Sequence, residues 1–282
     1  MKLSNENQFL LYCARFHSVD QIDNKLRQLI NLNWQEIIIK GKLHRILPLI
    51  YYHLKRLDKN DIPNKELKYL KQNYQNILMR NRIYFKELRK LIYCFKEERI
   101  KVVLLKGGFL SEYVYKDIGL RPFSDIDILI ERKSMKKAKN IMGKLGFVEG
   151  KFNKIEKKIE EFSKSQKIIN ERYTGHLEFV KYDNKMSNGL ITIEIHSNIF
   201  WNDEERHFVG NIASVWRNLI LLRNGKGKGL YRLSNEYFLL HSCFHLFKDA
   251  TSIGKIAESR DLRLLNFTDI YEIIMHFNSK LD

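Results

Sequence analysis

The stretch from Leu104 to Ile130 constrains the fold of this chain more than any other part of the sequence. A β-branched run over residues 100–105 predicts a buried strand, which ends in a Lys-Gly-Gly turn at 106–108. Residues 109–115 fit one or two helical turns, and alternating polar and apolar residues over 123–130 predict a second strand. We therefore expect the chain to be organised around these two strands.

Asp125 and Asp127 lie two residues apart in the second predicted strand, so their carboxylates are expected on one face. Ile126 and Ile128 then point to the opposite, buried face. Two adjacent carboxylates repel, and each raises the other's pKa unless a cation lies between them. Mg²⁺ suits such a pair because it takes hard oxygen ligands and leaves positions open for phosphate oxygens. Taken alone, the Asp-x-Asp pattern also fits the solvated face of a strand.

A third carboxylate lies in an apolar alternation over residues 190–196, which predicts another strand. The apolar and polar residues of this run face opposite ways, with Ile191, Ile193 and Ile195 against Thr192, Glu194 and His196. If this strand lies beside the Asp strand, the three acids can hold two metal ions about 3.5–4 Å apart. Glycines between a strand and a helix also let backbone N–H groups approach a phosphate. The combination predicts a metal-dependent nucleotide site.

The order of these features resembles the nucleotidyltransferase fold of the polymerase-β type. In detail, the chain resembles the bacterial family of uncharacterised nucleotidyltransferases. The resemblance lies in Leu-Lys-Gly at 105–107, Tyr115, the run RPFSDIDILI at 121–130 and Glu-Ile-His at 194–196. It implies an α+β fold in which a small mixed β-sheet core is flanked by N- and C-terminal helical regions. It also implies an enzyme that transfers an NMP group from an NTP to a hydroxyl of a small-molecule, protein or RNA acceptor.

The resemblance assigns a metal role to the three acids, with Mg²⁺ as the implied cofactor and Mn²⁺ as an alternative. Asp125 and Asp127 would bind both ions, and Glu194 would bind one of them. Two histidines have open roles. His196 would contact substrate or hydrogen-bond the neighbouring acid, and His176 would reach the site or stay exposed at the end of a strand.

The resemblance also assigns the residues that would bind the triphosphate. Its charge would be met by Lys106 and Arg121, although Arg121 fits equally well a role in fixing the corner before the Asp strand. The β- and γ-phosphates would be held by the backbone of Gly107 and Gly108 and by Ser124.

Helical periodicity on both sides of the strands divides the chain into residues 1–99, a core at 100–200 and residues 201–282. In the first region, helices are expected at 34–39 and 44–57, broken at Gly41 and kinked at Pro48, and a long helix at 66–99.

Other features outside the strands can be explained by an ordinary structural role as well as by a functional one. The charged segment 152–172 fits a surface helix or a mobile flap, and 224–229 fits a basic surface loop. His241 and His245 have the i, i+4 spacing of a metal pair, but no third ligand is evident.

The formal net charge of +17, from 50 Lys and Arg against 33 Asp and Glu, suits a polyanionic partner such as nucleic acid. A background bias toward lysine explains the same number. Two alternative functions follow: a nucleic-acid-binding module without catalysis, and a toxin- or defence-type nucleotidyltransferase acting on tRNA. The sequence names neither the acceptor nor the NTP.

Three scattered cysteines without a CxxC pair fit reduced thiols, and the N-terminus has no apolar signal core. No run approaches the ~18 apolar residues of a membrane span. We therefore expect a cytoplasmic protein without membrane association.

Overall fold

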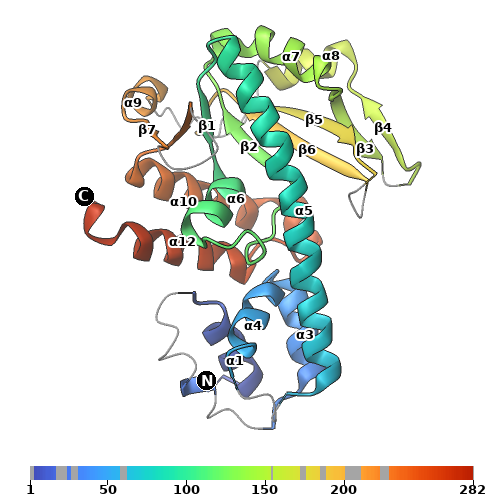
Figure 1. Ribbon diagram of the computed structural model, residues 1–282, viewed down its shortest axis with the longest axis vertical. Helices are drawn as coiled ribbons and strands as arrows, with labels where there is room; N and C mark the ends of the chain where they lie inside the picture. Colours follow the sequence, from blue (N-terminus) through green and yellow to red (C-terminus); the bar gives the residue numbers. More distant parts are fainter. Residues whose placement is uncertain are drawn as a thin grey trace. The chain divides into compact units, whose positions relative to one another are not determined.

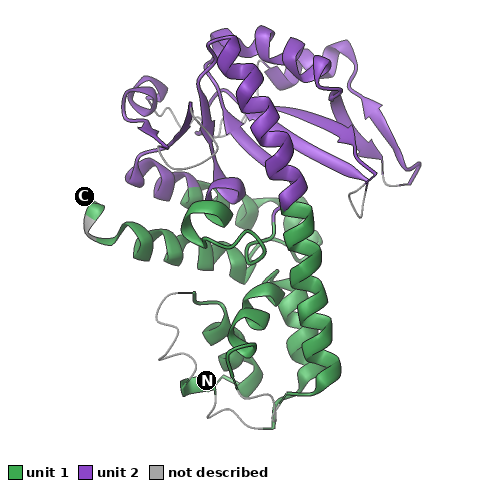
Figure 2. Ribbon diagram, viewed as in Figure 1, with its two compact units in different colours: residues 1–81, 110–122, 242–282 green, residues 82–109, 123–241 purple. Residues whose placement is uncertain are grey.

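The computed structural model describes residues 3–16, 24–26, 31–57, 62–153, 155–171, 176–184, 189–200, 211–222 and 229–281 (Figure 1). The chain forms two compact units, each assembled from separate stretches of sequence (Figure 2). Unit 1 comprises residues 1–81, 110–122 and 242–282, and unit 2 comprises residues 82–109 and 123–241. The three consecutive regions expected from helical periodicity divide the chain differently and stay a prediction.

Unit 2 contains a mixed sheet of eight strands within the described residues, in the order β4-β3-β5-β6-β2-β1-β8-β7. The strands are β1 (Val102–Leu104), β2 (Ile126–Leu129), β3 (Val148–Asn153), β4 (Lys158–Glu161), β5 (His176–Tyr182), β6 (Leu190–His196), β7 (Ile220–Leu221) and β8 (Leu230–Arg232). β2 pairs in parallel with β6 and antiparallel with β1, and β6 pairs antiparallel with β5. The predicted α+β fold with a mixed sheet is confirmed.

The central strands follow the alternation of their sequences. Ile126 and Ile128 of β2 are fully buried, as are Ile193 and Ile195 of β6. The hairpin expected between β5 and β6 forms, and the strand that carries Glu194 lies beside the Asp strand as predicted. Because apolar side chains fill one face of these strands, their polar residues are gathered on the other.

Helices complete the core of unit 2. They are residues 82–97 of α5 (Asn64–Glu97), α6 (Lys106–Phe109), the 3₁₀ turn η3 (Arg132–Ser134), α7 (Met135–Lys144), α8 (Lys164–Ile169), α9 (Ile212–Arg217) and the start of α10 (Asn235–Thr251). Tyr84 and Phe85 of α5 pack edge-on against Phe123, and Phe109 contacts Phe238 of α10. The long helix expected at 66–99 is confirmed as α5.

Unit 1 is helical within the described residues. Its elements are α1 (Asn5–Cys13), α3 (Trp34–Leu43), α4 (Leu47–Leu54), residues 64–81 of α5, the π-helix η2 (Leu110–Val114), the end of α10, α11 (Ile253–Ala257), α12 (Leu264–Phe277) and η5 (Asn278–Lys280). Phe9 packs on Trp34, and the Phe16 N–H donates to Glu272 Oε1 at 2.6 Å. The second contact ties the N-terminal helices to α12.

Two predictions for these helices are wrong. α3 continues through Gly41 to Leu43. The glycine does not break the helix; it is buried, and its missing side chain lets α4 pack closely against α3. A Cβ at Gly41 would lie 2.8 Å from Leu47 Cδ2 and 2.9 Å from Ile50 Cδ1. Pro48 does not kink a helix, since it lies in the first turn of α4, where no intrahelical N–H bond is lost.

Two further expectations need correction. The C-terminal region is not wholly helical, because β7 and β8 extend the sheet and β8 pairs in parallel with β1. Segment 152–172 is not a single surface helix, and the alternative of a mobile flap stays a prediction. Its described residues form the β3–β4 hairpin and α8, and Ser163 and Gln166 cap the start of α8 reciprocally.

Most of the basic loop at 224–229 lies outside the described residues. Among the described helices, none is long and apolar enough to cross a membrane.

Candidate active site

The polar face of three neighbouring strands carries a row of carboxylates. Glu178 of β5 faces Glu194 of β6, and Glu194 faces Asp127 of β2, so the row crosses the sheet at one level. Next to this row, His176 of β5 faces His196 of β6. The pairing register of the strands determines this row. A shift of one residue in the pairing of a strand would point its acid toward the opposite, apolar face of the sheet.

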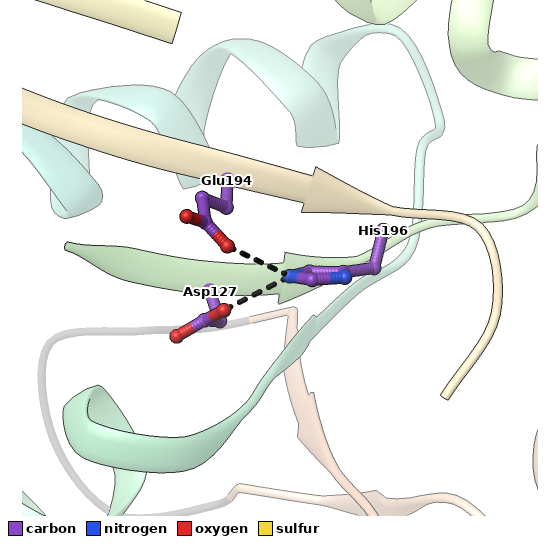
Figure 3. A group of neighbouring side chains, drawn as sticks. All are labelled: Asp127, Glu194 and His196. Carbon is purple, nitrogen blue, oxygen red and sulfur yellow. Dashed lines mark hydrogen bonds and ion pairs between the residues drawn. The ribbon is translucent and has the colours of Figure 1, made fainter. Parts of the chain in front are cut away.

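Figure 3 shows Asp127 and Glu194 directed at the same ring nitrogen of His196. His196 Nε2 lies 2.9 Å from Asp127 Oδ1 and 3.6 Å from Glu194 Oε2. His176 Nε2 lies 3.3 Å from Glu194 Oε2, and the His176 ring stacks on the His196 ring at 5.2 Å. These four side chains, Asp127, Glu194, His176 and His196, are termed the acid–histidine cluster below.

Lys106 adds a positive charge to the acid–histidine cluster. Its Nζ lies 2.5 Å from Asp127 Oδ1, while the preceding residue, Leu105, donates its N–H to the Asp127 carbonyl at 3.0 Å. Lys106 begins α6 with a φ of 39°, in the left-handed region that costs a non-glycine residue about 1–2 kcal/mol. The predicted turn is therefore where the chain leaves β1 and directs an ammonium group at the acids.

The contacts within the cluster shift the pKa values of Asp127, Glu194 and His196 toward their charged forms. Burial by itself would raise the pKa of Asp127, but the Lys106 ammonium and His196 outweigh it and lower that pKa to about 2. Burial likewise opposes ionisation of Glu194, and hydrogen bonds from His176 and His196 take its pKa well below the usual value. Burial favours neutral His196, but its bonds to the two acids raise its pKa. The site thus sets two buried carboxylates against the Lys106 ammonium and a histidine whose protonated form they favour.

A comparison with known families gives this geometry its context. The model of a family described as uncharacterised nucleotidyltransferase matches residues 31–282. The chain belongs to this family. None of the curated proteins matches it. Membership makes the chain an enzyme of the transferase class, with a nucleoside triphosphate as substrate.

Nucleotidyl transfer usually relies on a divalent metal ion, and the donor atoms of this nucleotidyltransferase fit one. Among the described residues, Asp127, Glu194 and His196 form a group whose ligand atoms all lie within 4.8 Å of one another. Carboxylate oxygens are the ligands that Mg²⁺ and Mn²⁺ prefer. Lys106 Nζ and His196 Nε2 already lie against an oxygen of Asp127, so this carboxylate is directed at positively charged or hydrogen-bonding groups.

Asp125 and Ser124 lie just before β2 rather than within it, which corrects the strand expected from residue 123. Asp125 is outside the group of ligand atoms around His196. It is close enough to contribute to the raised pKa of Lys106, after Asp127 and Glu194. Ser124 Oγ donates to Asp125 Oδ2 at 3.3 Å, and the Tyr84 hydroxyl donates to the Ser124 carbonyl. The loop therefore holds the second aspartate near the cluster.

Arg121 and the two glycines differ in their placement. Gly107 and Gly108 are buried in α6 directly after Lys106. Arg121 lies in unit 1, where its Nη2 is 2.6 Å from Asp269 Oδ2 and its Nε is 3.2 Å from the same oxygen. This ion pair, in which two nitrogens of Arg121 contact Asp269, agrees with the alternative interpretation that Arg121 fixes the corner before the Asp strand.

The two C-terminal histidines do not form a metal pair within the described residues, since neither belongs to a group of potential ligands. His241 is buried in unit 2, and its Nδ1–H donates to the Ile199 carbonyl at 3.2 Å. Burial, followed by the charges of Lys106 and His196, lowers the pKa of His241 to about 3, so it is neutral. His245 belongs to unit 1 and lies 3.9 Å from Asp249.

Glu178 is the residue of this site that sequence reasoning missed. Burial and the charge of Glu194 raise its pKa, in contrast to the lowered pKa values of Glu194 and Asp127. A signal was present, because His176 and Glu178 alternate with the buried residues Leu177 and Phe179 in the same way as the polar and buried residues of the Glu194 strand. Only the antiparallel register of β5 and β6 shows that the two glutamates face each other.

Proposed function

We propose that this nucleotidyltransferase transfers an NMP group from an NTP to a hydroxyl of its acceptor with the help of divalent metal ions. The observation that carries the proposal is the register that sets Asp127 opposite Glu194, with Lys106 and His196 against the two carboxylates. Burying carboxylates such as Asp127 costs free energy unless they are paired with cations, so a cation-binding site is the function that best explains the acids on these inner strands.

Asp127 and Glu194 would hold the metal, and Asp125 would join them from the loop before β2. Mg²⁺ is the first choice and Mn²⁺ the alternative. When bound, the metal neutralises the negative charge that builds up on the phosphate oxygens. Lys106 would then turn from Asp127 to the triphosphate, beside the backbone of Gly107 and Gly108 and the Ser124 hydroxyl.

The reaction forms a bond between the acceptor hydroxyl oxygen and the α-phosphorus. The bond from the α-phosphorus to its bridging oxygen breaks, and pyrophosphate leaves with the electron pair. The hydroxyl proton needs a base, and Glu178 is the best proton acceptor of the carboxylate row because its pKa is raised. We leave Arg121 out of phosphate binding, since its guanidinium is engaged by Asp269.

The test is transfer of label from each α-labelled NTP to components of a cell extract, with Mg²⁺ or Mn²⁺ and with a chelator. Asp127→Asn and Glu194→Gln are expected to reduce transfer by about 10³-fold or more, the scale of losing a group that stabilises the transition state. Glu178→Gln is expected to cost about 10²-fold and to flatten the acid limb of the pH–rate profile.

Glu97→Gln is the matched control, because Glu97 is an exposed acid of unit 2 at the end of α5. It should transfer label at the wild-type rate. Label that persists in the Asp127→Asn, Glu194→Gln double variant would show that the chemistry lies elsewhere. Absence of transfer, of NTP binding and of metal binding in the wild type would overturn the proposal and favour a non-catalytic role.

A further inference from the structure

His241 of α10 has a buried ring nitrogen that accepts no hydrogen bond from any described residue. The side chain is 6% exposed, and the unpaired atom is Nε2. The other ring nitrogen, Nδ1, lies 3.2 Å from the Ile199 carbonyl, which can only accept a hydrogen bond. The ring proton of the neutral side chain is therefore on Nδ1, and Nε2 presents a lone pair. A buried acceptor costs free energy until a donor reaches it, so a donor is expected here.

Two contacts within unit 2 place the His241 ring beside the acid–histidine cluster. His241 and Phe238 are three residues apart and therefore share one face of α10. The Phe238 ring contacts the ring of Phe109 at 4.6 Å, and Phe109 ends α6, the short helix that begins at the lysine of the site (Figure 1). The second contact is the bond to Ile199, which lies three residues after His196. The ring thus lies between the two chain segments that carry the lysine and this histidine of the site.

The charges of the site reach His241 and narrow what its Nε2 atom can do. After burial, the charges of Lys106 and His196 lower the pKa of His241, which is about 3, while Asp127 opposes them. A ring with so low a pKa is a poor base near neutral pH. Nε2 also lies outside the group of potential metal ligands found among the described residues. Its remaining role is to accept a hydrogen bond, and a hydroxyl is the neutral donor that substrates of this class carry.

The order of the strands indicates which substrate brings this hydroxyl. The carboxylate row runs from Glu178 on β5 across β6 to Asp127 on β2, and β1 follows with Lys106 just after its end. α10 begins at Asn235, shortly after β8, and β8 pairs with β1. His241 therefore reaches the site from the side proposed for the triphosphate, away from the base proposed for the acceptor hydroxyl. On that side, the hydroxyls belong to the ribose of the NTP.

We propose that His241 Nε2 accepts a hydrogen bond from a ribose hydroxyl of the bound NTP, which makes His241 a residue that determines sugar specificity. The hydroxyl is the 2′ or the 3′ group. A site built to bond a hydroxyl rejects the analogue that lacks it, because its own buried polar atom is then left unpaired. The inference rests on the proposed function for the side of the site that the triphosphate occupies. It concerns binding of the NTP and does not require transfer.

The test is calorimetry of the full chain with Mg²⁺ and no acceptor, using the NTP that binds most tightly and its 2′-deoxy and 3′-deoxy analogues. At least one analogue is expected to bind about tenfold more weakly than the NTP, the scale of one hydrogen bond that is lost. Equal affinity for the NTP and both analogues would overturn the proposal. A wild-type chain that binds no NTP at all would overturn both this proposal and the proposed function.

Two substitutions separate the two ring nitrogens. In His241→Asn, the amide N–H takes the place of Nδ1–H and can keep the bond to Ile199, while the Nε2 acceptor is removed. In His241→Gln, the amide oxygen takes the place of Nε2, while the bond to Ile199 is lost. His241→Asn should therefore bind the NTP and its analogues within about twofold of one another. His241→Gln should keep the wild-type preference, although its melting temperature falls. The reverse pattern would show that His241 only anchors Ile199, and would overturn the proposal.

His245 provides the matched control on the same helix. It lies one turn after His241, belongs to unit 1 and is 3.9 Å from Asp249. His245→Asn makes the same substitution and should keep the wild-type preference for the NTP. Equal losses of preference in His241→Asn and His245→Asn would show a general effect on α10 and would overturn the assignment to Nε2.

Nitrogen-15 NMR of the unaltered chain tests the contact without any substitution. The signal of the Nε2 lone-pair nitrogen of His241 should move when the NTP binds, and should stay in place when the weaker-binding analogue saturates the site. A signal that moves with neither ligand would show that water satisfies Nε2, and would overturn the proposal. The proposed function fails separately. A chain that keeps this preference and this shift, but transfers no label, would refute nucleotidyl transfer and leave the role of His241 standing.

Discussion

Lys106 controls how much negative charge the acid–histidine cluster presents. Burial favours the neutral amine, yet Asp127 and Glu194 raise the pKa of Lys106, so the ammonium persists. An unpaired buried charge is strongly unfavourable, and here each charge has its partner at contact distance. The Lys106 ammonium therefore occupies a position next to Asp127 that would otherwise attract a divalent cation. Metal and lysine are expected to compete for Asp127.

This competition predicts that Lys106→Met binds Mn²⁺ more tightly than the wild type when no nucleotide is present. Removal of one positive charge at contact with a ligand carboxylate should raise the affinity about tenfold or more. The same variant should bind NTP more weakly, because it lacks the group that would meet the triphosphate. Electron paramagnetic resonance of free Mn²⁺ and calorimetry of NTP binding measure the two effects.

Lys101→Met serves as the control, since Lys101 precedes β1 and its ammonium lies over the Tyr231 ring, outside the cluster. It should change neither affinity. If Lys106→Met bound Mn²⁺ no better than Lys101→Met, the lysine would not be competing for the metal ligands.

Among the elements, α5 has a second role beyond filling the core of unit 2. Its Tyr84 hydroxyl donates to the Ser124 carbonyl and accepts the Thr192 N–H at 3.3 Å. One buried phenol therefore ties the helix both to the loop that carries Asp125 and to the strand that carries Glu194. The relative position of these two acids depends on this link.

Tyr84→Phe is therefore expected to lower the free energy of unfolding by about 1–3 kcal/mol, because the Ser124 carbonyl and Thr192 N–H lose a buried partner. Urea denaturation measures this change, and hydrogen exchange at the Asp125 and Ile126 amides should become faster. Tyr93→Phe on the same helix is the control, since Tyr93 is 66% exposed and should be neutral. Equal exchange rates in the two variants would contradict the role of Tyr84.

How much of these elements the sequence predicts depends on whether the signal is local. Alternation places Asp127 and Glu194 on polar faces, and their side-by-side arrangement follows from two strands that share a buried face. β7 and β8 were missed because they are two and three residues long, too short for any period to appear. Asp125 falls outside the strand because pairing with β6 begins only at Ile126, and such long-range pairing leaves no trace in the local pattern.

At the scale of the whole molecule, the course of the chain decides which parts can fold alone. Unit 1 combines residues 1–81 with 110–122 and 242–282, so its core is complete only after the C-terminal helices are made. α12 supplies the buried residues Leu265, Ile273 and Phe277 to this core. Its Asp269 accepts from the Tyr115 hydroxyl at 3.0 Å and pairs with Arg121.

Deletion of residues 252–282 should therefore expose the amides of α1, α3 and α4 to rapid hydrogen exchange, while the central strands of unit 2 stay protected. The physical reason is that the shortened chain loses the Glu272 acceptor of the Phe16 N–H, the buried face of α12 and the partner of Arg121. Deletion of residues 278–282 alone is the control and should leave protection intact. If residues 1–99 folded as an independent helical domain, their protection would survive both deletions, and exchange mass spectrometry distinguishes the two outcomes.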